Sequence, residues 1–311
     1  MRTYIFQRLL MFIPVMLAVY TLVFVVMHAT PGGPWDKTER PLPAAVLNNL
    51  KVKYGLDKPL WQQYGSYLWG VVSRFDFGPS LKGGRTANEI IRDTFPVSLQ
   101  LGLLAFVIAL VLGITLGIIA AVRHNTWVDY VTMLFSVIGI STPAYVITTL
   151  LIVLLAIRLH LVPTGGWGGI FDVRALIPAI TLALGPTALL ARYTRASLLE
   201  VIGADYVRTA RAKGLRGRLV IVRHALPNAL IPVLTLAGPI LTNLITGSFF
   251  VESISQVPGL GRFFVRTVLD LDYPLLIAVT LLYAAIIWLM NFVVDLLYNY
   301  LDPRVRMKAQ S

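Results

Sequence analysis

The sequence predicts an all-α integral membrane protein with six membrane-spanning helices. Charged residues make up only 14% of its 311 residues, whereas a soluble protein carries about 25%. Several stretches of more than twenty residues contain no Asp, Glu, Lys or Arg, and the charges gather between these stretches. A helix of about 20 apolar residues crosses a hydrocarbon layer of ~30 Å. The charge-free stretches therefore fit a membrane rather than the core of a soluble protein.

Six stretches meet this requirement. The predicted spans cover residues 9–29, 97–122, 130–157, 175–191, 225–250 and 273–294. The first follows basic residues, as a signal peptide does, but it is too long for one and no small-residue cleavage site precedes Pro31, so we expect it to be retained. Pro143 is expected to kink the third span. Gly113 and Gly117 are expected to let the second span pack closely within the chain.

The segments between the spans define the expected domains. Residues 35–96 hold nine basic and six acidic residues. Aromatic and apolar side chains recur there at helical spacing, which predicts an amphipathic helix at the membrane surface. These residues are Trp61, Tyr64, Tyr67, Leu68 and Trp69. Residues 158–174 and 251–272 are expected to be loops. We expect an N-terminal end with the first span (1–34), an external region (35–96), and a permease core (97–311) with a coupling loop (192–228).

The distribution of charge predicts the orientation. Between Arg192 and Arg223 there are eight basic and two acidic residues, which places this loop in the cytoplasm. Counting spans then puts both termini in the cytoplasm and residues 35–96 outside. The net charge of +12 is explained by this positive-inside pattern, so we expect membrane lipid and no nucleic acid as a partner. The expected location is the inner or plasma membrane of a cell.

Motifs for catalysis are missing. The sequence has no GxxxxGK[ST] phosphate loop, no HExxH, no GxSxG and no cysteine. It therefore predicts no catalytic residue, no metal site and no cofactor, and no enzyme activity of its own. Acidic side chains are nearly absent from the predicted spans, although a proton-coupled carrier normally has them. If the chain transports a solute, the energy must come from a partner.

The basic loop contains a short predicted helix. Residues 204–213 favour a helix that ends at Gly214, because glycine commonly caps a helix at its C-terminus. Tyr206, Val207 and Ala210 form a narrow apolar stripe on it. Leu226 and Pro227 then lead into the fifth span. A loop that only marks the cytoplasmic side would explain the charge, but not a capped helix of fixed length followed by a Leu-Pro turn.

This loop resembles the EAA motif of permease subunits of ATP-binding cassette (ABC) importers. That pattern has a small residue, a glycine four positions later and Leu-Pro twelve to thirteen positions further on, matched here by Ala210, Gly214 and Leu226-Pro227. The Asp-Tyr-Val-Arg-Thr-Ala-Arg-Ala-Lys-Gly-Leu segment resembles the dipeptide and oligopeptide subfamily, B-type subunit. Further segments typical of that subfamily lie at 54–60, 258–261, 272–274 and 301–306. Gly33 departs from it, since the family commonly has Asp there.

The resemblance implies a type I ABC importer permease fold and a defined set of partners. These are a second homologous permease subunit in a heterodimer, two cytoplasmic ATPase subunits and an extracytoplasmic solute-binding protein. It also implies that the 204–214 helix couples the permease to an ATPase. The implied coupling residues are Asp205, Tyr206, Arg208, Thr209, Ala210, Arg211, Ala212, Lys213, Gly214, Leu226 and Pro227.

The resemblance leaves the solute open. Di- and oligopeptides are expected, and nickel chelates, glutathione and oligosaccharides are the alternatives within similar permeases. A channel or secondary carrier is the competing functional class, and an assembly factor without transport is a third. Neighbouring genes for two ATPases and a binding protein would separate these classes.

Overall fold

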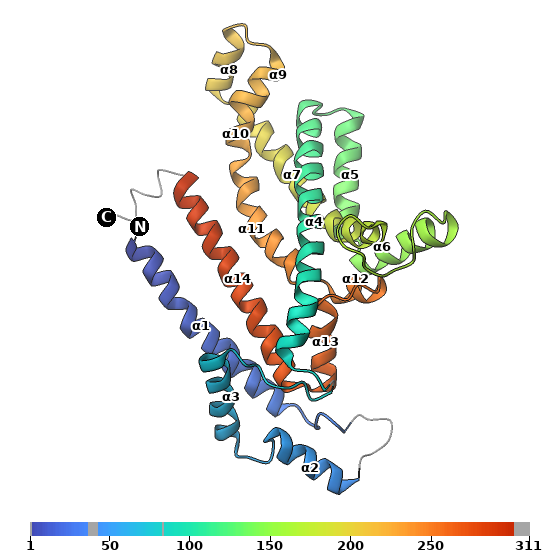
Figure 1. The fold of residues 1–311 in the computed structure, drawn as a ribbon. Helices are drawn as coiled ribbons and strands as arrows, with labels where there is room; N and C mark the ends of the chain where they lie inside the picture. The colour runs from blue at the N-terminus through green and yellow to red at the C-terminus, as the bar shows by residue number, and fades with distance from the viewer. Residues whose placement is uncertain (1, 37–42, 83, 302–311) are drawn as a thin grey trace. The chain divides into compact units, whose positions relative to one another are not determined.

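The computed structural model describes residues 2–36, 43–82 and 84–301, and most of them form helices (Figure 1). The α-helices are α1 (Arg2–Ala29), α2 (Ala44–Tyr54), α3 (Leu60–Arg74), α4 (Ala87–Val122), α5 (Trp127–Ser141), α6 (Ala144–Leu151), α7 (Leu176–Ile202), α8 (Asp205–Ala212), α9 (Gly217–Leu219), α10 (Leu226–Ala229), α11 (Ile231–Ile245), α12 (Phe249–Ile254), α13 (Gly261–Asp270) and α14 (Tyr273–Leu301). Three short helices, η1 (Ile152–Arg158), η2 (Val173–Ala175) and η3 (Val220–Ala225), join them. This confirms the all-α class. Residues 302–306 of the C-terminal motif lie outside the described residues.

Four helices are long and apolar enough to cross a membrane, and two bent helix pairs raise the number to six if each pair is one span. The four are Phe6–Ala29, Ala87–Val122, Val173–Ile202 and Tyr273–Val294. In the first bent pair, α5 and the α6–η1 segment meet at 106° around Pro143. The kink predicted there is confirmed as a complete break, because Pro143 has an extended ψ of 136°. The second pair bends by 54° between α10 and α11.

Two spans extend more than two turns beyond their predicted bounds. The second begins at Ala87 instead of residue 97, because Thr86 and Glu89 form a reciprocal capping box. The Thr86 N–H donates to Glu89 Oε2 (2.9 Å), and the Glu89 N–H donates to Thr86 Oγ1 (3.2 Å). The fourth span continues past Ala191 to Ile202, since its buried face continues through Thr194 and Leu198 while Arg192 is exposed on another face.

The fifth span and the loop after it also differ from the prediction. The long helix α11 ends at Ile245 rather than at residue 250, and Gly247, with φ of +79°, redirects the chain into α12. The expected loop of residues 251–272 contains most of α12 and all of α13. The ten residues of α13 include Arg262, Arg266 and Asp270. A search for long apolar stretches therefore overlooks this helix.

The chain divides into two compact units. Unit 1 consists of Met1–Ser98 and Gly259–Leu289, and unit 2 consists of Leu99–Pro258 and Met290–Ser311. In unit 1, Tyr20 and Phe24 of α1 form a buried cluster with α14 and with the side chains of Tyr64, Tyr67 and Leu68. The predicted aromatic helix is therefore α3, and these three of its side chains pack against protein within unit 1.

A buried carboxylate fixes a loop to the beginning of α14 within unit 1. Asp272 is 2% exposed, and it accepts hydrogen bonds from the Ser80 hydroxyl and from the Leu81 N–H (3.1 Å). The Trp35 indole N–H donates to the Leu81 carbonyl (3.2 Å). Burial raises the pKa of Asp272 above its ordinary value of 3.8, while the two donors act in the opposite direction.

We expect Asp272→Ala to lower the free energy of unfolding by about 1–3 kcal/mol, because the Ser80 and Leu81 donors lose a buried acceptor. Asp272→Asn keeps an acceptor and should cost less. Since the folded pKa is raised, the Asp272 contribution is complete below pH 3.8 and is lost as the pH rises through the folded pKa. Thermal unfolding of the purified complex across pH tests this. If the stability of Asp272→Asn depended on pH as steeply as that of the wild-type protein, the prediction would be wrong.

Unit 2 is built around α7, which packs against α5, α6, α10 and α11. The close packing predicted for Gly113 and Gly117 is confirmed. A Cβ on Gly113 would lie 2.7 Å from Leu190 Cβ, and one on Gly117 would lie 2.5 Å from Thr194 Cβ. The two glycines therefore let α4 approach α7 within the same chain.

Candidate coupling site

The basic segment folds as a small helical cap at one end of unit 2 (Figure 1). Helix α7 ends at Ile202, and only Gly203 and Ala204 separate it from α8. The predicted helix of residues 204–213 is confirmed as α8 (Asp205–Ala212). Gly214 follows with φ of +77°, the left-handed conformation that glycine adopts without a steric penalty. The segment then returns through α9 and η3 to α10.

The inner face of α8 holds the helix against its own chain. Val207 (0% exposed) and Ala210 (5% exposed) belong to a buried cluster, which we call the cap core. Its other members are Ala121, Leu198, Val220, Ala225 and Ala229. Ala210 is one of the implied coupling residues. Its side chain fills the cap core, because α8 buries Val207 and Ala210 where it packs against α7 and η3.

The outer face of α8 is exposed. Asp205, Tyr206, Arg208, Thr209, Arg211, Ala212, Lys213 and Gly214 are all solvent-exposed. The ion pair between Arg208 and Asp205 spans 3.7 Å, and an exposed pair of this kind contributes little to stability. The face thus presents basic side chains on a helix whose position is fixed from behind.

Two contacts that were not predicted from the sequence join α8 and α7 to other elements. Asn228 Nδ2 of α10 donates to the Tyr206 hydroxyl (2.8 Å). This ties α8 to the Leu226-Pro227 turn, where Pro227 lies in the first turn of α10 at a position that needs no N–H donor. Asn228 directly follows the Leu-Pro motif, but no pattern in the sequence indicates its partner 22 positions away.

The second contact is a buried ion pair. Asp129 at the beginning of α5 is 1% exposed and accepts two hydrogen bonds from the Arg195 guanidinium of α7, at 2.5 and 2.7 Å. The Asn125 N–H (3.1 Å) and His124 Nδ1 (3.2 Å) also contact Asp129. The pair joins α5 to α7 two turns before α7 ends at Ile202. Arg195 was seen in the sequence only as one of many basic residues.

No three His, Asp or Glu side chains gather at a possible metal site in the part of the chain that the structure describes. The absence of catalytic, metal-binding and cofactor-binding residues therefore stays a prediction from the sequence.

Two family models match most of the chain. Residues 113–307 match the binding-protein-dependent transport system inner membrane component, and residues 1–102 match the N-terminal model of the same membrane components. The chain belongs to this family. It is thus the multi-pass inner membrane permease of an ABC importer and is not itself an enzyme. The family resemblance seen in the sequence is confirmed.

Curated relatives of this permease match it over nearly all of its length. It is 42% identical to the dipeptide transport system permease protein DppB of Bacillus subtilis (strain 168), covering 100% of both chains. It is 41% identical to the oligopeptide transport system permease protein OppB of Escherichia coli (strain K12), over 98% of this chain and 100% of the relative.

Solved structures support the fold. The MetNI methionine ABC transporter in an inward-facing form has a chain with a TM-score of 0.56 and 18% identity, covering 69% of this permease and 97% of that chain. A chain of an amino acid ABC transporter with histidines has a TM-score of 0.50 and 18% identity, covering 70% of this permease and 94% of that chain. These similarities confirm the ABC importer permease fold.

Gly214→Ala is expected to weaken transport-coupled ATP hydrolysis. A Cβ there would meet nothing within 4 Å, so the cost is the left-handed backbone alone, about 1–2 kcal/mol. Gly217→Ala is the matched control, because Gly217 lies in equally open space without a positive φ. Hydrolysis by the reconstituted complex would measure both variants. Equal activity in the two would show that the left-handed cap has no role.

Proposed function

We propose that this permease takes up di- and oligopeptides and that the outer face of α8 is the docking site for a cytoplasmic ATPase subunit. The peptide class is supported by the names of full-length relatives that are about 40% identical. The docking site is supported by the geometry of α8. A helix whose inner face is buried and whose outer face is exposed transmits force as a rigid element, and the outer face is free to meet a partner.

The proposed assembly contains four kinds of chain. A second homologous permease forms a heterodimer with this one, two ABC ATPases bind on the cytoplasmic side, and a solute-binding protein delivers the peptide from outside. Closure of the ATPases around ATP would displace α8. Since Val207 and Ala210 pack in the cap core and α8 follows α7 after two residues, the displacement would pass to the spans and give alternating access.

The proposed orientation places both termini and the basic segment 192–228 in the cytoplasm and residues 35–96 outside, with a permease core from residue 97 onwards. The chain contains no cysteine, so single cysteines can be introduced cleanly. We expect Ser66→Cys to react with a membrane-impermeant thiol reagent on intact cells. Arg218→Cys should react only after the membrane is opened. The reverse pattern would contradict the orientation.

Uptake of labelled di- and tripeptides tests the proposed solute. Deleting the gene should abolish binding-protein-dependent uptake, and the wild-type gene should restore it. If peptide uptake is unchanged while uptake of a nickel chelate, glutathione or an oligosaccharide is lost, the peptide proposal is wrong and the transport class stands.

The energy source is tested separately with purified chains. The permease alone should not hydrolyse ATP, because its sequence has no phosphate loop. Hydrolysis should require the ATPase subunits and should rise when the solute-loaded binding protein is added. Saturable ATP binding by the isolated permease would refute the proposed division of labour.

A further inference from the structure

Helix α3 has three distinct faces. One face packs on α1 and α14 and consists of Tyr64, Tyr67, Leu68 and Val71. A second, polar face consists of Gln62, Gln63, Ser66 and Ser73. The third consists of Trp61, Gly65, Trp69 and Val72, spaced four, four and three residues apart, and we call it the tryptophan stripe. Its three side chains are apolar and mainly exposed: Trp61 by 73%, Trp69 by 69% and Val72 by 64%.

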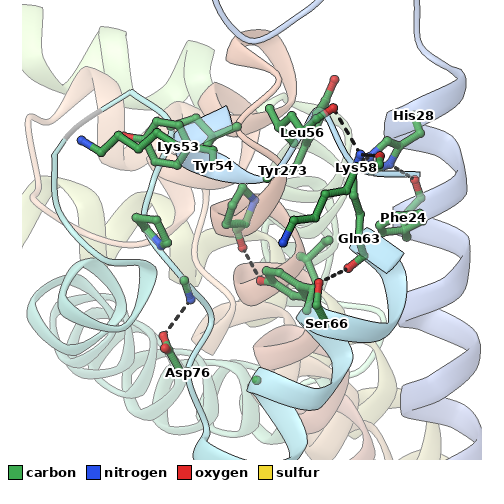
Figure 2. Close-up of a pocket in the computed structure, with 18 of the residues that line it drawn as sticks. Phe24, His28, Lys53, Tyr54, Leu56, Lys58, Gln63, Ser66, Asp76 and Tyr273 are labelled. Carbon is green, nitrogen blue, oxygen red and sulfur yellow. Dashed lines mark hydrogen bonds between the residues drawn. The ribbon is translucent and has the colours of Figure 1, made fainter. Parts of the chain in front are cut away.

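The polar face of α3 borders a cavity of about 390 Å³. Figure 2 shows Gln63 and Ser66 at this cavity together with Lys53, Lys58 and Asp76. Gln63 Nε2 donates to the Lys58 carbonyl (2.7 Å). Charged and amide groups around an open cavity mark the side of α3 that faces water. The tryptophan stripe lies on a different side and contains no polar group except the two indole N–H groups.

Two sets of hydrogen bonds fix the level of α3 relative to the spans of unit 1. The Tyr20 hydroxyl of α1 donates to the Tyr64 carbonyl, and the Tyr64 and Thr21 hydroxyls share a hydrogen bond, both at 2.8 Å. Tyr20 lies nine residues before the end of the span Phe6–Ala29, about 14 Å along the helix. The Tyr67 hydroxyl donates to the carbonyl of Pro274 (2.9 Å), in the first turn of α14. The Tyr67 contact thus places α3 at the beginning of α14, where that span meets the membrane boundary, and the Tyr20 and Thr21 contacts hold it against the C-terminal half of α1.

We infer that the tryptophan stripe of α3 lies in the lipid interface at the C-terminal end of α1 and anchors unit 1 there. Tryptophan is favoured in this layer because its ring is apolar and its N–H reaches the headgroups. Such an exposed stripe would be unfavourable in water. In the interface its apolar side chains meet lipid, while the polar face of the same helix stays hydrated.

Lipid fits this position better than a protein partner. The neighbouring span α1 is the most exposed of the four continuous spans, with 11% of its apolar window buried. Leu22, Val25 and Val26 on this part of α1 are more than half exposed, so the span beside α3 has the composition of a lipid-facing helix. Apart from its two indole N–H groups, the stripe has no charged or hydrogen-bonding side chain that would favour a specific protein partner.

Spin labels on α3 test this inference in the assembled transporter in lipid nanodiscs. The cysteine-free chain permits single labels at Trp69→Cys and Val72→Cys on the stripe. Ser66→Cys and Ser73→Cys on the polar face of the same helix are matched controls. We expect the ratio of collisions with oxygen to collisions with a water-soluble nickel complex to be several-fold higher on the stripe than on the polar face. A label at Val25→Cys of α1 gives the value for a lipid-exposed site.

Two results would overturn the inference. Equal accessibility of both faces to the nickel complex would place the stripe in water. Low accessibility of the stripe to both oxygen and nickel would show that another protein chain covers it. The Ser66 label lies on the polar face of the same helix and serves as a folding control. If a variant misfolds α3, the ratio of oxygen to nickel collisions at Ser66 would no longer differ from the ratio at Val25.

Discussion

Ala210→Glu is expected to abolish transport-coupled ATP hydrolysis while the chain still inserts into the membrane. Ala210 is 5% exposed and lies in the cap core with Val207 and Leu198. A glutamate there has no room, because Ala210 packs among buried apolar side chains. Burying an unpaired carboxylate costs several kcal/mol. Helix α8 would therefore leave its position, and the outer face would no longer match the ATPase.

Thr209→Glu is the matched control, because Thr209 precedes Ala210 on the same helix but is exposed. The same charge is added there without burial, so we expect a smaller loss of transport-coupled ATP hydrolysis. The measurements are peptide uptake, ATP hydrolysis and copurification of the ATPases with each variant at equal expression. If Ala210→Glu retains wild-type hydrolysis, α8 is not held by the cap core in the working transporter. If Thr209→Glu is the more damaging change, direct contact on the outer face dominates over packing.

The features that follow from local chemistry were predictable from the sequence. Apolar length identified the spans, Pro143 marked the break between α5 and α6, and Gly214 marked the end of α8. Each of these depends on one residue type or on a short stretch of chain, because proline and glycine constrain the backbone wherever they occur.

Features that depend on long-range packing were not predictable. The aromatic spacing of α3 predicted an amphipathic helix. In the structure Tyr64 faces α1, whereas Trp69 is exposed. Periodicity alone does not indicate what each face of a helix contacts. The sequence likewise did not show that Ala210, one of the implied coupling residues, packs inside its own chain. The Asp129–Arg195 pair joins residues 66 positions apart, and no spacing rule reaches that far. The capping box at Thr86 was visible in the sequence, and a search for capping patterns would have found the beginning of α4.

That ion pair leads to the second large effect. Arg195→Gln is expected to lower the free energy of unfolding by about 3–5 kcal/mol, because it leaves Asp129 buried without its main partner. Asp129 is 1% exposed on its side chain, whereas Arg195 is 23% exposed. Asp129→Asn should therefore cost less, since the remaining guanidinium can turn towards water. The two single variants should differ in stability because Arg195→Gln leaves a buried charge unpaired, whereas Asp129→Asn leaves a partly exposed one.

The double variant Asp129→Asn with Arg195→Gln separates this explanation from a simple loss of contacts. Removing both charges leaves no uncompensated ion, so the double variant should be more stable than Arg195→Gln alone, and the two effects should not add. Arg192→Gln is the control, because Arg192 lies on the same helix but is exposed. Thermal unfolding of the complex in nanodiscs and retention of the ATPase subunits would be measured for all four variants. If the stability losses of the two single variants add in the double variant, or if the Arg192 variant is as unstable as the Arg195 variant, Asp129 is not held by Arg195.

With the pair intact, α5 and α7 move together at the end that carries α8, which is the condition for α8 to act on the spans as a rigid element.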